Sequence, residues 1–457
     1  MNHFFAIALL LYLVVFIVIC TLDFKKIASF TDYSVAGKKQ HTLSVVMTLL
    51  ATVVGASTTI GITTTVYRIG FPGFWWLAFG AVGLILQSVF LSQKVRDIGA
   101  DTLPDLAGQI VGRPAEIIIS AIIVSSWIGV IAGQLMAMDS LITYALGRSS
   151  PLLFVITSII VIGYTAIGGQ MSVVKTDKVQ LIFILFGITC CMGCLYSTKG
   201  CNNAAIIQHI ELLNNNYNVS NLLTQFFVIG GVYLLGPDIM SRNFMAKDST
   251  SAKNAALITG AVLFLFSLVI TLIGMWLKFN IPPEEIGDGE ALMYAVSLLP
   301  EWASILLLFG LLSAIVSSTD TCIINASVIF VKDILRKDSV TGGRVTVIVI
   351  GLIALMLALF GQRDIMSLLT GAYSIYTPGV IFPLLVAIAA FKKRRVHPGT
   401  WIAAVVAGGL FGILGTYMGN ALADMDVPAV IMNNLTLFGM ALSLALSLMS
   451  VRWKEAV

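Results

Sequence analysis

The sequence predicts an all-α integral membrane fold with about 13 transmembrane helices. Of its 457 residues, 58% are apolar and only 11% are charged, whereas ordinary soluble domains carry about 25% charged residues. A soluble chain would leave much of this apolar surface in water, but a lipid bilayer accepts it. The net charge of +4 is small, so the sequence gives no sign of nucleic-acid binding.

Thirteen apolar stretches are each near or above the roughly 20 residues that a spanning helix needs. We expect the first stretch to be a retained helix and not a signal peptide, because no basic region precedes it and no small-residue cleavage site follows it. The stretches are 3–22, 43–66, 74–93, 115–146, 151–168, 178–197, 221–240, 254–278, 303–331, 345–361, 366–391, 399–418 and 429–451.

The lysines and arginines of the loops predict the orientation of these helices. Five of the 27 basic residues fall on one set of loops, and the remainder, Arg242 among them, fall on the other set. Because cytoplasmic loops are enriched in Lys and Arg, we expect a multi-pass protein of the cell membrane with its N-terminus outside and its C-terminus in the cytoplasm. The longer outside segments, 198–220 and 279–302, are expected to carry short surface helices. The five outside residues are Arg68, Arg148, Lys199, Lys278 and Arg363.

Two of the predicted spans contain residues that favour a break in the helix. In the second span, small, β-branched and hydroxyl residues surround Gly55 and favour non-helical backbone. In the seventh span, Gly230-Gly231 and then Gly236-Pro237 lower the cost of a break. These spans lie five helices apart, an odd offset that inverts topology, so they predict inverted repeats with matching broken first helices. Such repeats are typical of secondary transporters, although glycines also permit close helix packing.

Three stretches resemble the sodium:solute symporter family, and the resemblance extends over nearly the whole chain. Residues 164–180, YTAIGGQMSVVKTDKVQ, are similar to the longest signature of the family. Residues 313–320, SAIVSSTD, resemble its motif in the eighth core helix, and residues 32–37, DYSVAG, resemble its segment before the first core helix.

The resemblance implies a leucine-transporter-like fold and, with it, sodium-coupled import of a small organic solute. In that fold ten core helices form two inverted five-helix repeats within a single transmembrane domain. For this chain the implied domain is 1–457, with an N-terminal extra helix at 3–22, repeats at 43–197 and 221–391, and two C-terminal extra helices at 399–451.

The resemblance also implies a site for Na⁺, a hard cation that prefers oxygen ligands. Ala314, Ser317 and Ser318 are spaced i, i+3 and i+4, so they share one helix face. The unwound part of the first core helix adds the backbone carbonyls of Ala51 and Val54. These five positions match the main sodium site of the family, so we expect Na⁺ as the coupling ion. The spacing alone fits a packing seam of small residues equally well.

Asp177 lies, by the same resemblance, on the cytoplasmic exit path for sodium. An aspartate at the start of a helix between Lys175 and Lys178 would otherwise pair with those lysines. Some family members bind a second sodium ion nearby, using a serine pair one turn further along the eighth core helix. This chain has Asp320 and Thr321 at those positions, which puts a second sodium site in doubt.

In this family the solute binds across core helices 1, 2, 3, 6, 7 and 10. This chain lacks the arginine, the polar pairs and the aspartate that mark sialic-acid, sugar and proline importers. The expected site is therefore small, hydroxyl-lined and weakly charged, and the expected solute is a small organic acid or an amino acid. A carboxylate would bind at exposed backbone N–H groups. Aromatic candidates are also natural lipid-belt or core residues. The candidates are Val53, Gly55, Ser57, Thr58, Trp75, Trp76, Gln134, Phe227, Tyr233 and Tyr373.

Two alternative functions stay open. In a proton-coupled transporter, Asp177 or Asp139 would carry the titrating group. A sensor would use the same fold without transport, but only residues 452–457 follow the last predicted helix, so no output domain is expected. A channel and an enzyme are disfavoured, because the chain shows no ring of polar residues and its four histidines lie in loops or at ends. The expected partners are a small solute, sodium and the bilayer, with no nucleic acid and no obligate protein partner.

Overall fold

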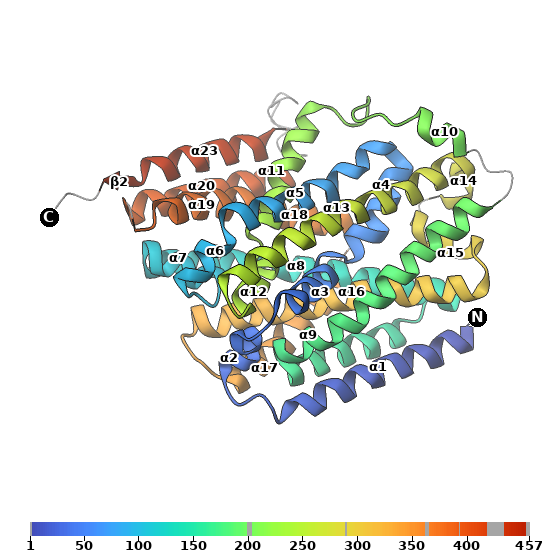
Figure 1. Ribbon diagram of the computed structural model, residues 1–457, viewed down its shortest axis with the longest axis horizontal. Coiled ribbons are helices and arrows are strands. Elements are labelled where there is room, and N and C mark those ends of the chain that lie inside the picture. The colour runs from blue at the N-terminus through green and yellow to red at the C-terminus, as the bar shows by residue number, and fades with distance from the viewer. Residues whose placement is uncertain are drawn as a thin grey trace.

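The computed structural model describes residues 2–198, 203–287, 290–361, 365–392, 394–417 and 434–453. This part of the chain is almost entirely helical, and its long helices run side by side (Figure 1). Within it, nine helices are long and apolar enough to cross a membrane, and ten if the bent pair Thr42–Val53 and Ser57–Ile69 counts as one span. The all-α membrane fold is therefore confirmed, whereas the number thirteen stays a prediction.

The first half of the chain supplies four long helices, one broken helix and several short turns. The elements are α1 (Asn2–Phe24), α2 (Phe30–Val35), η1 (Ala36–Lys38), α3 (Thr42–Val53), η2 (Ser57–Gly61), α4 (Ile62–Ile69), η3 (Phe71–Phe74), α5 (Trp75–Phe90), α6 (Ser92–Ile98), α7 (Leu103–Val111), α8 (Arg113–Leu146) and α9 (Pro151–Ser197).

The second half supplies the remaining long helices and two short strands, β1 and β2, that pair antiparallel. The elements are α10 (Asn203–Gln208), α11 (Val219–Leu235), α12 (Pro237–Met245), α13 (Ser249–Asn280), α14 (Pro283–Ile286), α15 (Ala291–Leu298), α16 (Glu301–Ile329), η4 (Phe330–Ile334), α17 (Val340–Phe360), α18 (Ile365–Tyr376), η5 (Thr377–Ile381), α19 (Phe382–Ala390), β1 (Arg394–Val396), α20 (Pro398–Tyr417), α23 (Leu435–Met449) and β2 (Val451–Trp453).

Both spans with break signals are interrupted, and the second span breaks at only one of its two signals. The chain bends by 63° between Thr42–Val53 and Ser57–Ile69, which confirms the break around Gly55. In the other span the break lies at Gly236 (φ −63°, ψ 143°), where Pro237 begins α12. Gly230-Gly231 stay inside α11, so the expectation of a break there is wrong. Proline has no N–H to donate to the helix, whereas the glycine pair only allows neighbouring helices to approach.

A single element, α9, covers two of the predicted spans, 151–168 and 178–197. Its 47 residues are interrupted only at Gly169 (φ 54°, ψ −164°), a conformation that side chains disfavour. The ring of Tyr33 lies 2.5 Å from where a Cβ of this glycine would be. The predicted end of the first span at 168 is therefore confirmed, whereas the second helix begins directly after this turn and not at 178, because one glycine is enough to turn the chain.

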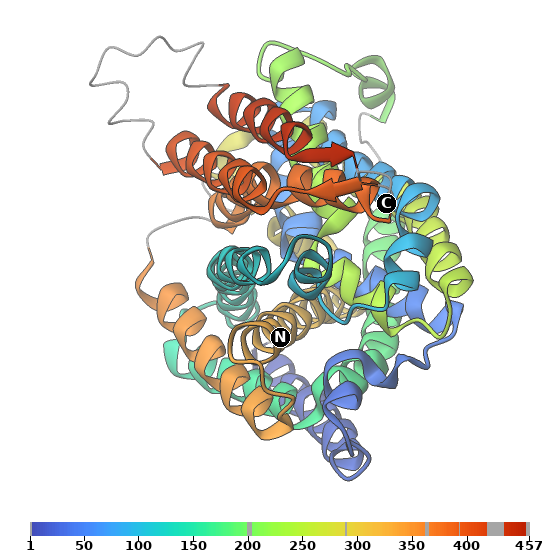
Figure 2. The ribbon, with the colours of Figure 1, turned by 90° about the vertical axis from the view of Figure 1, so that its left-hand side faces the viewer.

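The helices α9 and α16 approach each other closely at two glycines. A Cβ on Gly187 would lie 2.7 Å from the carbonyl oxygen of Leu306, and one on Gly310 would lie 2.8 Å from that of Phe183. In the end-on view of Figure 2 the late helices α20 and α23, orange to red, pack at one edge of the bundle. The start of the predicted span 429–451 lies outside the described residues.

The short elements gather at the two ends of the long helices. Figure 1 shows α10, α14, α15 and the N-terminus at one end, and α2, α6, α7 and the C-terminus at the other. The short helices expected on the segments 198–220 and 279–302 are thus present as α10, α14 and α15. Which end faces the cytoplasm stays a prediction from the basic residues.

We expect the substitution Gly310→Val to lower the melting temperature of the purified protein. An overpacked contact of this kind costs about 1–3 kcal/mol, because the backbone of α9 leaves no room for the new methyl groups. Gly193→Val on α9 is the matched control, since this glycine is exposed and nothing lies within 4 Å of its Cβ position. Equal shifts of the two variants in a thermal unfolding assay would contradict the close contact of α9 with α16.

Candidate functional site

The backbone N–H groups at the break after α3 are hydrogen-bonded to nearby side chains. The N–H of Gly55 donates to the hydroxyl of Thr58 at 2.8 Å, and the N–H of Ala56 donates to the side-chain oxygen of Gln134 at 3.0 Å. A Cβ on Gly55 would lie 2.5 Å from Oγ of Ser318. Backbone groups at membrane depth need partners, and the side chains of Thr58 and Gln134 supply them. At Gly55 the break lies in close contact with α16.

The residues expected to bind sodium meet at this break. Ser317 donates to the carbonyl of Ala51 at 2.7 Å and to that of Ala314 at 3.1 Å. Ser318 donates to the carbonyl of Thr52 at 2.9 Å. Val54 is the capping residue directly after α3, with the non-helical angles φ −95° and ψ 84°. The five expected residues therefore lie on two facing segments, and the hydroxyl groups of Ser317 and Ser318 join these segments by hydrogen bonds to the carbonyls of Ala51 and Thr52.

Asp177 pairs with an arginine that the sequence analysis assigned to a loop. Arg242 donates to Asp177 at 3.1 Å, and both side chains are fully buried. Arg242 lies on α12, so its assignment to a cytoplasmic loop is wrong, as is a pairing of Asp177 with its neighbouring lysines. The short distance along the sequence from Gly236 to Arg242 could have indicated that this arginine is buried. A helix that starts at a break inside the membrane is still inside it after about six residues.

Three consecutive residues of α16 contact the buried charges. Asp320 accepts from the hydroxyl groups of Tyr164, at 3.0 Å, and Thr165. Thr321 accepts from Arg242, and the thiol of Cys322 lies 3.4 Å from Asp238. The positions where some relatives would place a second sodium ion are thus occupied by groups that are already hydrogen-bonded.

A cavity of about 40 Å³ lies between the broken helices and α8. A water molecule occupies about 30 Å³ in the liquid, so the cavity is too small for an organic solute in this conformation. The expected solute-binding residues that line the cavity are Val53, Gly55, Ser57, Gln134, Tyr233 and Tyr373.

The other expected solute-binding residues lie outside this cavity. Thr58 adjoins it and bonds to the break itself. Trp76 lines a larger hollow of about 780 Å³ nearer the α10 end. Trp75 donates to the carbonyl of Leu212 at 2.9 Å, and the side chain of Phe227 is 38% exposed.

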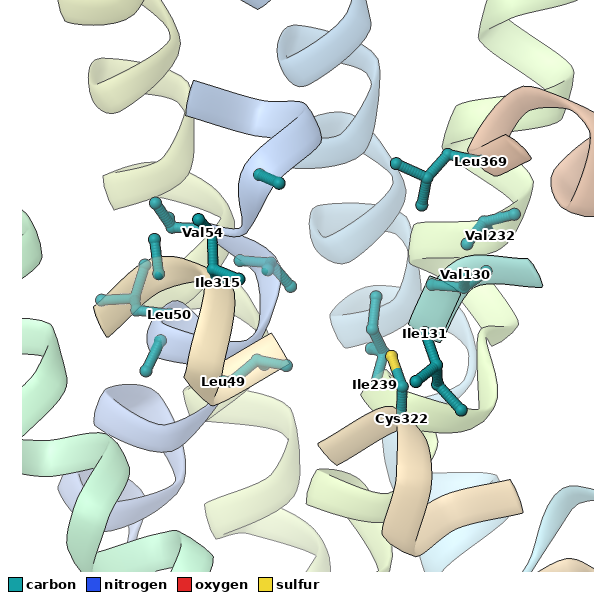
Figure 3. Close-up of a cluster of buried hydrophobic side chains, with 14 of the residues drawn as sticks. Leu49, Leu50, Val54, Val130, Ile131, Val232, Ile239, Ile315, Cys322 and Leu369 are labelled. Atoms are coloured by element: carbon teal, nitrogen blue, oxygen red, sulfur yellow. The ribbon is translucent and has the colours of Figure 1, made fainter. Parts of the chain in front are cut away.

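The sequence analysis missed Asp238, which lines the same cavity from the first turn of α12. Its carboxylate accepts from Nε1 of Trp127 at 2.7 Å and from Nδ2 of Asn325 at 2.9 Å. Apolar side chains surround the break and the cavity in two groups. In Figure 3 these are Leu49, Leu50, Val54 and Ile315 on one side, and Val130, Ile131, Val232, Ile239, Cys322 and Leu369 on the other.

A cluster of ion pairs ties three segments together at the α2 end of the bundle. Asp101, between α6 and α7, pairs with Lys38 of η1 and with Lys332 of η4. Lys332 also lies 3.2 Å from Asp105. Burial raises the pKa of Asp101, but hydrogen bonds and charge from Lys332 and Lys38 outweigh it and hold the pKa below its ordinary value. The carboxylate is therefore ionised at every pH above about 4, and the cluster is intact at neutral pH.

The sequence pattern of the sodium:solute symporter family matches residues 33–408. The chain belongs to the sodium:solute symporter family. The sodium/pantothenate symporter of Haemophilus influenzae is 26% identical over 66% of this chain and 66% of its own length. That of Escherichia coli is 23% identical over 84% of each chain. High-affinity choline transporter 1 of Drosophila melanogaster is 23% identical over 82% of this chain and 64% of its own length. The Haemophilus and Drosophila matches thus span just under two thirds of those proteins.

Solved structures share the architecture. A Na⁺-coupled sialic acid symporter aligns with a TM-score of 0.82 at 13% identity, covering 99% of both chains. A transporter of the nucleobase-cation-symport-1 family aligns with a TM-score of 0.58 at 13% identity, covering 91% of this chain and 93% of the other. At these identities the likeness establishes the fold alone. The family resemblance read from the sequence is confirmed, as is a multi-pass membrane transporter fold.

We expect Arg242→Met to destabilise the protein by about 3–5 kcal/mol, because it leaves Asp177 buried without its cation. The double variant Arg242→Met/Asp177→Leu should regain much of the lost melting temperature. Lys247→Met is the control, since its pair with Asp248 at 3.8 Å is exposed and such pairs contribute little. A double variant no more stable than Arg242→Met would contradict the buried pair.

We expect Asp101→Asn to loosen the α2 end of the bundle. Losing charged hydrogen bonds to two lysines costs about 1.5–3 kcal/mol, so amide hydrogen exchange in residues 99–105 should quicken about tenfold or more. Asp97→Asn on the adjoining helix α6 changes an exposed carboxylate and should leave exchange unchanged. Unaltered exchange in Asp101→Asn would show that the cluster does not hold these segments together.

Proposed function

We propose that the protein is a sodium-coupled secondary active symporter that imports a small organic solute by alternating access. The observation that carries this proposal is the contact of Ser317 and Ser318 with the carbonyls of Ala51 and Thr52, where α3 ends. Hydroxyl and carbonyl oxygens are the ligands that hard cations prefer. Transporters of this type bind their cargo where helices break inside the membrane, and the relatives named for pantothenate and choline act on small organic solutes.

Sodium is proposed to bind between Ala51, Val54, Ala314, Ser317 and Ser318. The serine hydroxyls now donate to carbonyls across the gap. An ion seated there would draw the same oxygens toward itself, and the hydroxyls would turn to present lone pairs. Binding of sodium would in this way replace direct bonds between α3 and α16 with bonds through the ion.

Asp177 is proposed to receive the ion on its way out. Its Oδ1 is buried and has no hydrogen-bond partner among the described atoms, while its Oδ2 is held by Arg242 and Thr48. One carboxylate oxygen is thus available to a passing cation. The positive charge of the guanidinium beside it repels that cation and keeps its binding weak.

The proposed repeats, 43–197 and 221–391, each begin with an interrupted helix, α3–α4 and α11–α12. Rocking of one bundle against another around such breaks is the usual route to alternating access. A single sodium ion moving through 100 mV releases about 2.3 kcal/mol, and a tenfold gradient adds about 1.4 kcal/mol. Together these energies support a roughly 500-fold accumulation of a neutral solute, so one sodium ion is sufficient to drive uptake.

Proton coupling is less well supported by the geometry. Asp177 is already paired with Arg242, and Asp139 does not line the cavity. Neither carboxylate is therefore placed to exchange a proton in step with a solute. Sodium remains the favoured coupling ion, and transport is favoured over sensing because the family and its named relatives are transporters.

We expect Ser317→Ala/Ser318→Ala to weaken sodium dependence. Each missing oxygen ligand should cost roughly 1.4 kcal/mol, which is about tenfold in affinity, so half-maximal thermal stabilisation by sodium should need at least tenfold more ion. Ser327→Ala on the same helix is the matched control, because this hydroxyl is buried at a distance from the break. Stabilisation by sodium that is equal in both variants would contradict the proposed site.

A further inference from the structure

The described residues that line the cavity of about 40 Å³ include one acidic residue and no basic residue. Among the described residues that line it, Asp238 carries the only formal charge, and its side chain is partly buried in the first turn of α12. Buried carboxylates at membrane depth are costly and mark functional sites by default. The presence of an acidic group here is opposite to what an anionic solute needs.

The hydrogen-bond partners of Asp238 are neutral. Trp127, Asn325 and Cys322 donate to its two oxygens. Arg242 lies one turn away on the same helix, but its guanidinium is bonded to Asp177 and to hydroxyl groups. No cation in the described part of the chain lies within salt-bridge distance of Asp238, so its charge is left for a partner from outside the protein.

The charge balance of the buried interior supports the same reading. The carboxylates of Asp177 and Asp320 are fully buried and that of Asp238 is partly buried, and Arg242 is the one guanidinium that faces them in the described residues. One sodium ion would compensate a second carboxylate. Asp320 is already hydrogen-bonded to two hydroxyl groups, whereas an ionised Asp238 would need a counter-charge, and a cationic group on the solute would supply it.

Two more features of the cavity disfavour an anion and favour an ammonium group. The N–H groups of Gly55 and Ala56 at the break are already bonded to Thr58 and Gln134, so they do not offer the free donors that a carboxylate needs. The rings of Tyr233 and Tyr373 line the cavity, and aromatic faces attract cations.

We infer that Asp238 binds the ammonium group of the solute, which is therefore an organic cation or a zwitterion and not a simple organic acid. The inference rests on the proposed function, because it assigns the substrate class of that same site. Of the two expected solute classes it keeps the amino acids and excludes simple organic acids, and it adds organic cations.

The test is thermal stabilisation of the purified full-length protein in sodium and in potassium. The probes are choline, a permanent cation; L-proline and glycine betaine, both zwitterions; and pantothenate, an anion. We expect stabilisation by at least one ammonium probe in sodium and none by pantothenate. Asp238→Asn should weaken that stabilisation about tenfold or more, while Asp238→Glu, which keeps the charge, should retain part of it.

Asp139→Asn is the matched control, because it removes a half-buried carboxylate on α8 that does not line the cavity. Stabilisation by pantothenate and by no ammonium probe would overturn the inference even if Asp238→Asn does not fold. So would ammonium binding that is unchanged in a folded Asp238→Asn, and so would the absence of stabilisation by every ammonium probe. Stabilisation of the wild type and of Asp238→Asn by sodium alone reports separately on the sodium site, so failure of the proposed function is distinguishable.

Discussion

The whole site depends on one constraint, which is that backbone N–H and C=O groups at membrane depth need partners. By breaking after α3, the chain frees such groups beside α16, and neighbouring side chains satisfy them. Gln134 and Thr58 accept from the freed N–H groups, and the two serines of α16 donate to the freed carbonyls. The two serines that help to make the break tolerable are therefore also oxygen ligands of the proposed sodium site.

The buried charges form a second layer that is built on α16. Residues 320–322 each contact a different part of it, so a small rotation of α16 changes the surroundings of Asp320, Arg242 and Asp238 together. Because the serines that face α3 lie one turn earlier on the same helix, movement at the proposed sodium site would be mechanically linked to movement at the carboxylate of the cavity. This link gives a physical basis for coupling between ion and solute.

Much of the fold was predictable because the thickness of a bilayer fixes the length of apolar helices. The break near Gly55 and the residues around it were predictable as well. In the seventh span the break lies at Gly236-Pro237 and not at the glycine pair Gly230-Gly231. The sequence does not distinguish a glycine pair that breaks a helix from one that allows close packing. Asp177 and Arg242 are 65 residues apart, and charge counting along loops gives no information about depth. The turn at Gly169 lies at the predicted end of the span 151–168, but its shortness was not predictable, because one residue in a left-handed conformation leaves no compositional trace.

The small volume of the cavity has a consequence for measured affinities. A space of about 40 Å³ admits no organic solute, so binding requires a more open conformation, and the apparent affinity falls in proportion to the population of that conformation. If one molecule in about ten were open, binding would be about tenfold weaker than the intrinsic contacts allow. Changes in the apolar packing around the break, distant from any contact with the solute, would therefore tune the concentration range in which the protein works.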